Sequence, residues 1–214
     1  MTTSAPPLKK DLEHAFYEAN PGIAPTRETS ALMQAAKLGG HDGLFWAKKL
    51  APVSDLNFMG QGRSGLTALS IAARNGDAPL VKALLALGAD PKASSDGYTA
   101  LMRAVASGSI ESVAALAPVS AVRSRDPSQS TALSLAAASS FREAVDILMP
   151  LHPANTAPTH FKNAANAARL YGNQAMAELI LSKARSVREA SELSNAIKGS
   201  PAAQGARVKR RPTL

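Results

Sequence analysis

The residues that decide the fold are GLTALSIAARNGD at 65–77 and APLVKALLALGAD at 78–90. In both halves the apolar residues recur three and four positions apart, which is the spacing of one face of an α-helix. Thr67 offers a side-chain oxygen that can cap the start of the first helix. Gly76 provides a turn that other residues adopt only with strain, and Gly88 is placed to end the second helix. The stretch therefore predicts two short helices joined by a tight turn.

The same pattern returns along the chain at a fixed step of 32 residues. Thr67 is followed at this step by Thr99, Thr131 and Asn163. The apolar positions that recur with them are Leu69, Leu101 and Leu133; Ala72, Ala104, Ala136 and Ala168; Val81, Val113 and Val145; and Leu84, Leu116, Leu148 and Ile180. A period of this length indicates a stack of supersecondary units in which each unit covers the apolar face of the next.

An earlier unit begins at Ser30, which lies 37 residues before Thr67. In three units a Leu-x-Pro sequence closes the second helix, because proline cannot continue a helix; the leucines are Leu50, Leu116 and Leu148. We therefore predict five repeats, at about 27–64, 65–96, 97–128, 129–160 and 161–184.

Both ends of the stack are predicted to be capped, because an end repeat would otherwise expose its apolar face. Residues 1–26 contain a candidate for a short capping helix at 8–20, and residues 185–198 place apolar residues on one helical face. For 185–198 the alternative is a frayed tail. The remaining 199–214 begin with a stretch rich in Gly, Ala and Pro, so we expect a disordered basic tail.

These residues resemble the ankyrin repeat, whose motif has a Gly-x-Thr opening, an Ala-Ala centre, a Gly in the middle, a Val-x-x-Leu-Leu run and a Gly-Ala-Asp ending. The resemblance implies an all-α, ankyrin-type solenoid of helix-turn-helix repeats joined by short hairpin loops. Ser70, Met102 and Ser134 stand where the family has a histidine. The hydrogen bond from that histidine to the threonine, which normally ties neighbouring repeats, is therefore absent, and we expect a stack less stable than an ideal one.

Composition agrees with thin helix pairs and sets limits on location. Apolar residues make up 45% of the chain but aromatic residues only 4%, which suits packing by Ala, Leu and Val. The chain has no cysteine, which excludes disulfides and fits a reducing compartment. No run is long and apolar enough for a membrane span, and the first ten residues lack the apolar core of a signal peptide. We expect a cytoplasmic monomer.

The net charge of +8 is concentrated toward the C-terminus, where Arg207, Lys209, Arg210 and Arg211 form a basic tail. Such a tail serves nuclear import, or loose attachment to nucleic acid or to anionic lipid. A solvated tail that only aids solubility is an equally good interpretation.

Residues that could carry chemistry are few. The sequence at 60–65 satisfies Gly-x-Gly-x-x-Gly, but a dinucleotide site also needs a buried strand before it, and 52–58 makes a poor strand. His152 and His160 are eight residues apart without a cysteine nearby, which is not the spacing of a zinc site. No Gly-x-Ser-x-Gly elbow occurs. We expect no cofactor, no metal and no enzymatic activity.

The resemblance implies that partners lie across the hairpin tips and the exposed side of the first helix of each repeat. The tips fall at about 56–64, 90–97, 122–129 and 154–161. The candidate partner-binding residues are Phe58, Arg63, Arg74, Lys92, Tyr98, Met102, Arg103, Arg123 and Arg125. Because arginine and lysine outnumber acids here, we expect a mildly basic surface that favours an acidic protein segment.

The function predicted from these residues is a non-catalytic adaptor or scaffold that binds another protein. Two alternatives stay open. One is a secreted effector or inhibitor that blocks a target protein, and the other is a nucleic-acid-associated factor that uses the basic tail.

Overall fold

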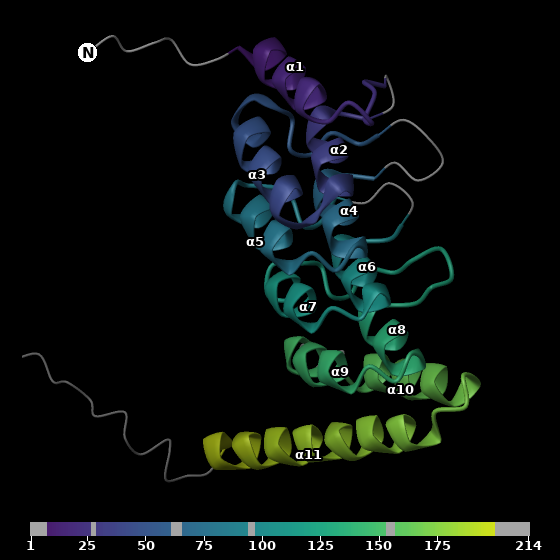
Figure 1. The fold of residues 1–214 in the computed structure, drawn as a ribbon. Coiled ribbons are helices and arrows are strands. Elements are labelled where there is room, and N and C mark those ends of the chain that lie inside the picture. The colour runs from purple at the N-terminus through teal and green to yellow at the C-terminus, as the bar shows by residue number, and fades with distance from the viewer. Residues whose placement is uncertain (1–7, 27–28, 61–65, 94–96, 153–156, 200–214) are drawn as a thin grey trace, which may run out of the picture.

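The computed structural model describes residues 8–26, 29–60, 66–93, 97–152 and 157–199 (Figure 1). Within these residues the regular elements are α-helices and two short 3-10 turns, and the only β pairing is an isolated bridge between Thr26 and Thr29. The prediction of an all-α solenoid is confirmed. Among the same residues no helix combines the length and the apolar character needed to cross a bilayer.

The helices follow one another in pairs. α1 (Lys9–Ala19) precedes α2 and α3 (Ala31–Leu38, Gly40–Leu50), α4 and α5 (Ala68–Arg74, Ala78–Ala86), α6 and α7 (Ala100–Ser107, Ile110–Leu116), α8 and α9 (Ala132–Ala138, Arg142–Leu148), and α10 and α11 (Ala157–Leu170, Gln174–Gly199). Figure 1 shows α2, α4, α6 and α8 in one row, which we call the first helices, and α3, α5, α7 and α9 in a second row beside it, the second helices. 3-10 turns at Ala51–Val53 and Met149–Leu151 follow α3 and α9.

The threonines of the repeat start the first helices in the same way in three successive units. The side-chain oxygen of Thr67 accepts a hydrogen bond from the Ser70 backbone N–H at 3.2 Å. Thr99 caps α6 with the same bond at 3.3 Å, and Thr131 caps α8 at 3.2 Å. Each bond satisfies a backbone donor that the helix itself leaves unpaired.

Replacing Thr99 with Ala is expected to lower the free energy of unfolding by about 1 kcal/mol, because α6 loses its capping acceptor in a buried position. Thr99→Ser keeps the hydroxyl and is the matched control. Urea denaturation followed by circular dichroism measures both. An equal loss in the two variants would show that the methyl group, and not the cap, stabilises this position.

Side chains in the turns tie neighbouring repeats together in place of the missing Thr–His bond. The Asn75 amide donates to the Ala36 carbonyl at 3.3 Å, and the Asn173 amide donates to the Ala138 carbonyl at 2.6 Å. In the first of these turns the Gly40 N–H also donates to the Asp77 carboxylate at 2.7 Å. Neighbouring repeats are therefore joined by hydrogen bonds even though the family's histidine is absent.

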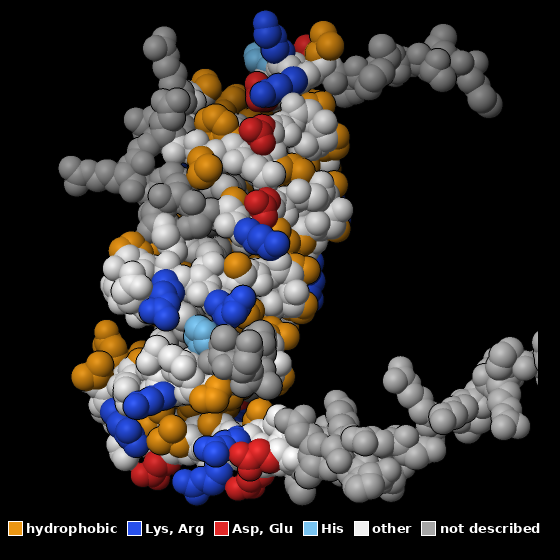
Figure 2. Space-filling view, turned by 180° about the vertical axis from the view of Figure 1, so that it is seen from behind, with side chains coloured by type: hydrophobic (Ala, Val, Ile, Leu, Met, Phe, Trp, Pro, Cys, Tyr) orange, Lys and Arg blue, Asp and Glu red, His pale blue; other side chains and the backbone are white. Residues whose placement is uncertain are grey.

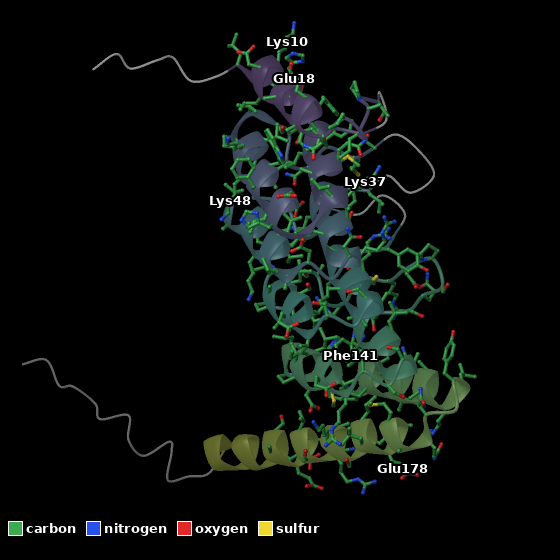
Figure 3. The ribbon with its side chains drawn as sticks, viewed as in Figure 1. Lys10, Glu18, Lys37, Lys48, Phe141 and Glu178 are labelled. Atoms are coloured by element: carbon green, nitrogen blue, oxygen red, sulfur yellow. The ribbon has the colours of Figure 1, made fainter. Side chains whose placement is uncertain are left out.

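The core is one continuous stripe that runs along the stack from Phe16 to Ile180. The leucine of each first helix lies at its centre, and Leu69, Leu101 and Leu133 are at most 1% exposed. The alanines three positions further are fully buried, and their small side chains let neighbouring helices approach closely. Lys48 of α3 is exposed, and Figure 3 shows it projecting away from the first helices.

α1 covers the N-terminal end of the stack. Phe16 is completely buried, and its ring meets the Trp46 ring of α3 edge-to-face, with centroids 5.4 Å apart. This geometry is favourable for aromatic pairs and adds to the area that they bury. α1 therefore packs on α3 of the first helix pair.

The C-terminal end differs from the prediction. Residues 185–198 do not form a separate capping helix, because α11 runs unbroken from Gln174 to Gly199. No proline or glycine interrupts this helix before its last residue. α10 also begins at Ala157, so it occupies most of the tip predicted at 154–161. Pro158 is compatible with this early start, since the first turn of a helix does not use the missing proline N–H.

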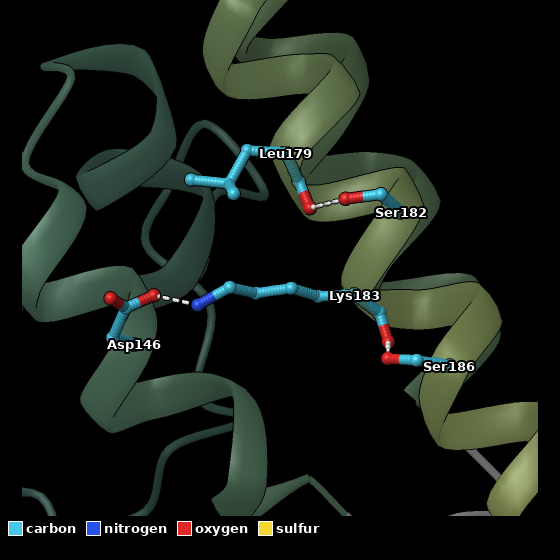
Figure 4. Close-up of polar contacts among 5 residues, drawn as sticks. All are labelled: Asp146, Leu179, Ser182, Lys183 and Ser186. Carbon is cyan, nitrogen blue, oxygen red and sulfur yellow. Dashed lines mark hydrogen bonds and ion pairs between the residues drawn. The ribbon is translucent and has the colours of Figure 1, made fainter.

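The long α11 is joined to the second helices as well as to α10. Lys183 forms an ion pair with Asp146 of α9 (Figure 4). The hydroxyls of Ser182 and Ser186 donate to carbonyls three residues earlier, both at 2.8 Å, so neither serine breaks the helix. α11 thus closes the described part of the stack.

Candidate partner-binding surface

Part of the predicted surface falls outside the described residues. This applies to Arg63, and to Arg207, Lys209, Arg210 and Arg211 of the basic tail. The remaining predicted residues are all placed by the structure.

The prediction that Met102 contacts a partner is wrong. Met102 is 1% exposed and packs in the core. Ser70 and Ser134, which lie one repeat away on either side, are also buried. This position of the first helix therefore faces inward in each unit, and the side chain there is unavailable to a partner.

Three further predicted residues lie outside the basic hairpin between α7 and α8. Phe58 is half-buried and packs against the core in the loop before α4. Arg74 is exposed at the C-terminal end of α4, and Lys92 is exposed in the hairpin after α5.

Tyr98 and Arg103 lie next to each other at the start of α6. The Arg103 guanidinium is 5.6 Å from the centroid of the Tyr98 ring, within the range of a cation–π contact. Just before them Gly97 has φ of +82°, and a Cβ there would come within 2.9 Å of Pro127 Cδ. This close approach sets the start of α6 against the hairpin of the next repeat.

That next hairpin, between α7 and α8, presents Arg123 and Arg125 to solvent. Its acid, Asp126, is only 3% exposed, and its carboxylate accepts a hydrogen bond from the Ser130 N–H at 2.8 Å. The Asp126 N–H in turn donates to the Ser130 carbonyl at 2.9 Å. Because Asp126 closes the turn, neither arginine has a carboxylate partner among the described residues.

His152, which follows the 3-10 turn after α9, and His160, near the start of α10, meet beside these arginines. The rings of His152 and His160 have centroids 4.7 Å apart. His152 is 6% exposed, and neither of its ring nitrogens has a hydrogen-bond partner in the structure. Burial, then the charges of His160 and Arg123, lower the pKa of His152 from 6.5 to about 4. Burial, then Arg125 and Arg123, also lower the pKa of His160.

We call Arg123, Arg125, His152 and His160 the basic cluster. Figure 2 shows basic side chains gathered beside a histidine on this face of the stack. The sequence predicts the two arginines as partner-binding residues, whereas it does not indicate a role for the two histidines. The repeat period could have indicated that the histidines lie near the arginines. One step of 32 before His152 and His160 lie Ser120 and Ser128, which flank Arg123 and Arg125 in their hairpin.

The buried His152 predicts a loss of stability in mild acid. Its pKa is about 4 when folded and 6.5 in the reference state, so the unfolded chain binds the proton more tightly. The contribution of neutral His152 to the stability of the folded state is complete above pH 6.5, and it is lost as the pH falls toward 4. Over this window the free energy of unfolding should fall by up to ~1.4 kcal/mol per pH unit from this one group.

Urea denaturation at several pH values tests this prediction. The control is His152→Leu, which removes the titrating group and keeps an apolar side chain beside Phe161, whose ring lies 6.0 Å from that of His152. We expect the variant to show a shallower decline between pH 6.5 and 4. Equal slopes in both proteins would contradict a buried neutral histidine.

A shallow apolar hollow lies on the first helices. It has a volume of about 310 Å³ and is lined by Val105, Ala106, Leu135, Ala138, Ser139 and Tyr171. Tyr171 at the end of α10 is 74% exposed, and its neighbour Leu170 is 85% exposed. Large exposed apolar side chains beside a hollow are typical of an interaction surface.

A family model described as ankyrin repeats (3 copies) matches residues 32–124, from α2 to the hairpin after α7. None of the curated proteins matches the chain. The matched residues include Tyr98, Arg103 and Arg123, whereas Arg125 and both histidines of the basic cluster lie beyond them.

Proposed function

Because this chain is an ankyrin-repeat protein, and such repeats generally mediate contacts between proteins, we propose that it is a non-catalytic adaptor that binds an acidic segment of another protein. The segment lies across the hairpin between α7 and α8 and across the starts of α6 and α10. These parts of the chain carry Tyr98, Arg103 and most of the basic cluster. Its apolar side chains reach the hollow on the first helices.

The observation that carries this proposal is the unbalanced charge of the basic cluster. Arg123 and Arg125 are exposed without a carboxylate partner among the described residues, and the one acid of their hairpin is turned inward. Cations held close together repel one another, and an incoming carboxylate relieves that repulsion. Complementary charge of this kind directs encounter and sets the orientation of a partner.

The hairpin geometry supports the proposal because it reduces the entropy lost on binding. Asp126 closes its turn with hydrogen bonds to Ser130 in both directions, and Gly97 packs on Pro127 of the adjacent hairpin. The arginines therefore project from a fixed backbone. Binding groups on a preorganised surface lose less conformational freedom than groups on a loose loop.

The apolar hollow supplies contacts with large side chains, which add binding energy to the charge interactions. Interface energy is concentrated in a few aromatic, arginine and other large side chains rather than spread over the contact area. Tyr171 offers such an anchor beside the hollow, and Tyr98 offers a second one under Arg103. A partner segment with acidic and apolar residues satisfies both parts of the surface.

Co-purification with the full chain tests this function. We expect one partner in stoichiometric amount, and an affinity for its isolated acidic segment that weakens as sodium chloride is raised, because salt screens exposed charges. Isothermal titration calorimetry measures the affinity at each salt concentration. A stoichiometric partner whose affinity does not change with salt would contradict recognition through the basic cluster.

A further inference from the structure

A second concave site lies at the C-terminal end of the stack, between α10 and α11. It is a groove of about 380 Å³. Its apolar surface is formed by Phe161 of α10 and by Leu181, Ala184 and Val187 of α11. Val187 is 46% exposed although it lines this apolar surface. No described element covers the groove, since α10 and α11 are the last helix pair of the structure.

The groove exists because α11 does not stop where a repeat would end. A second helix of ordinary repeat length would finish near residue 182, three steps of 32 beyond Ala86, where α5 ends. α11 instead continues to Gly199, and this extension brings Val187 alongside the start of α10. The early start of α10 at Ala157 supplies the opposite wall, through Pro158 and Phe161.

Cationic side chains line the groove beside its apolar surface. They are Lys162 of α10 and Arg185 and Arg188 of α11, all exposed. Arg188 is bound to Glu192, with Nε 2.8 Å from the carboxylate oxygen. No ion pair of the described residues involves Lys162 or Arg185, so both are available to an incoming anion.

We propose that this groove binds a short acidic segment of a partner protein that places apolar side chains on one face. The apolar side chains fill the space over Phe161 and Leu181, and carboxylates meet Lys162 and Arg185. The volume lies at the small end of the ~300–1,000 Å³ typical of binding pockets, so it accepts a few side chains rather than a folded domain.

Charge distinguishes this occupant from the two others that the chain itself could offer. The C-terminal residues carry four cations at 207–211, and cations are not complementary to a cationic rim. A second copy of the chain has a net charge of +8 and would be repelled as a whole. An acidic segment is attracted to the cationic rim from a distance, and the cations of the rim reduce the repulsion among its carboxylates once it is bound.

A labelled synthetic peptide tests the groove directly. The probe is a 12-residue peptide with leucines at helical spacing and glutamates elsewhere, titrated with the full chain by fluorescence polarisation. Its matched controls carry lysine in place of glutamate, or serine in place of leucine. We expect saturable binding of the probe, and binding at least ~10-fold weaker for either control peptide, which corresponds to ~1.4 kcal/mol.

Two protein variants assign the binding to the groove. Arg185→Glu should lower the affinity for the probe at least ~10-fold. Arg169→Glu should leave that affinity unchanged, because Arg169 is exposed on α10 and does not line the groove. Ala184→Phe should block the groove by filling it. Because Arg185 is fully on the surface, its substitution decides the question even if Ala184→Phe does not fold.

Several outcomes would overturn the proposal. They are equal binding of the lysine peptide, no saturable binding of the probe, and unchanged binding by Arg185→Glu. Saturable binding of dodecanoate measured by calorimetry, together with no peptide binding, would assign the groove to a small amphiphile instead. The basic cluster is proposed to bind a ligand of similar chemistry, although none of its residues lines the groove. The titration is therefore repeated with Arg123→Glu and Arg125→Glu combined. Binding that persists in this variant and is lost when Arg185→Glu is added belongs to the groove, whereas binding that disappears in the double variant itself would place the peptide on the cluster.

Discussion

Replacing both Arg123 and Arg125 with Glu should lower the affinity for the acidic partner at least ~10-fold. Two attractive contacts become repulsive, and like charges brought together cost several kcal/mol. The change should leave the fold intact, since both side chains are exposed and surface substitutions usually shift stability by within ~0.5 kcal/mol. Most of the loss should disappear at high salt, where the interaction is screened in both proteins. Calorimetric titration at two salt concentrations measures the effect.

The matched control for this charge reversal is Lys82→Glu. Lys82 is an exposed cation on α5, in the row of second helices, away from the hairpins. Changing it alters the net charge of the chain in the same direction without touching the proposed surface. If the double arginine variant binds as well as the wild type, or if Lys82→Glu weakens binding equally, recognition does not depend on the basic cluster.

Replacing Leu101 with Ala should lower the free energy of unfolding by about 2–5 kcal/mol. Leu101 is completely buried in α6, in the middle of the stack, and α6 packs against both α4 and α8. The lost methyl groups leave a cavity that the rigid helix pairs on either side fill only in part. The loss is a large fraction of the ~5–15 kcal/mol by which domains are usually stable.

Leu87→Ala is the control for this core substitution. Leu87 ends α5 and is 38% exposed, so its truncation removes similar atoms without opening a closed cavity. Urea denaturation of both variants gives the comparison. A loss at Leu101 no greater than the loss at Leu87 would mean that the centre of the stack is not packed as the structure has it.

The repeat and its helix boundaries could be predicted from the sequence because the causes are local. The capping threonine, the turn glycine and the Leu-x-Pro stop each act within a few residues. α3, α7 and α9 do end at Leu50, Leu116 and Leu148, as the proline positions predict. Periodicity then places the buried leucines, because one period shifts a side chain to the same position in the next unit.

The errors arise where the outcome depends on neighbouring repeats. The family resemblance assigns Met102 to the exposed side of its first helix, yet this position is buried in three successive units, where Ser70 and Ser134 also hydrogen-bond to their capping threonines. Residues 174–199 have no local breaker, so a helix break expected only from the family's repeat length does not occur. The groove between α10 and α11 follows from that unbroken helix and was not predictable from the repeat pattern.

The basic cluster shows what a sequence hides even when its period is known. Counting charges identifies Arg123 and Arg125, but the contact between His152 and His160 depends on how the 3-10 turn after α9 lies against the start of α10. The loss of Asp126 as a surface charge is likewise a matter of geometry, since its carboxylate turns inward to Ser130. Charge counting alone therefore underestimates how basic this surface is.

Hydrogen exchange of the chain, free and bound to its co-purified partner, tests the central claim most directly. We predict slower exchange on binding at the start of α6, in the hairpin 120–130 and at the start of α10, with little change in α3, α5 and α7. Protection confined to those second helices would contradict the account, because it would place the partner on the opposite side of the stack.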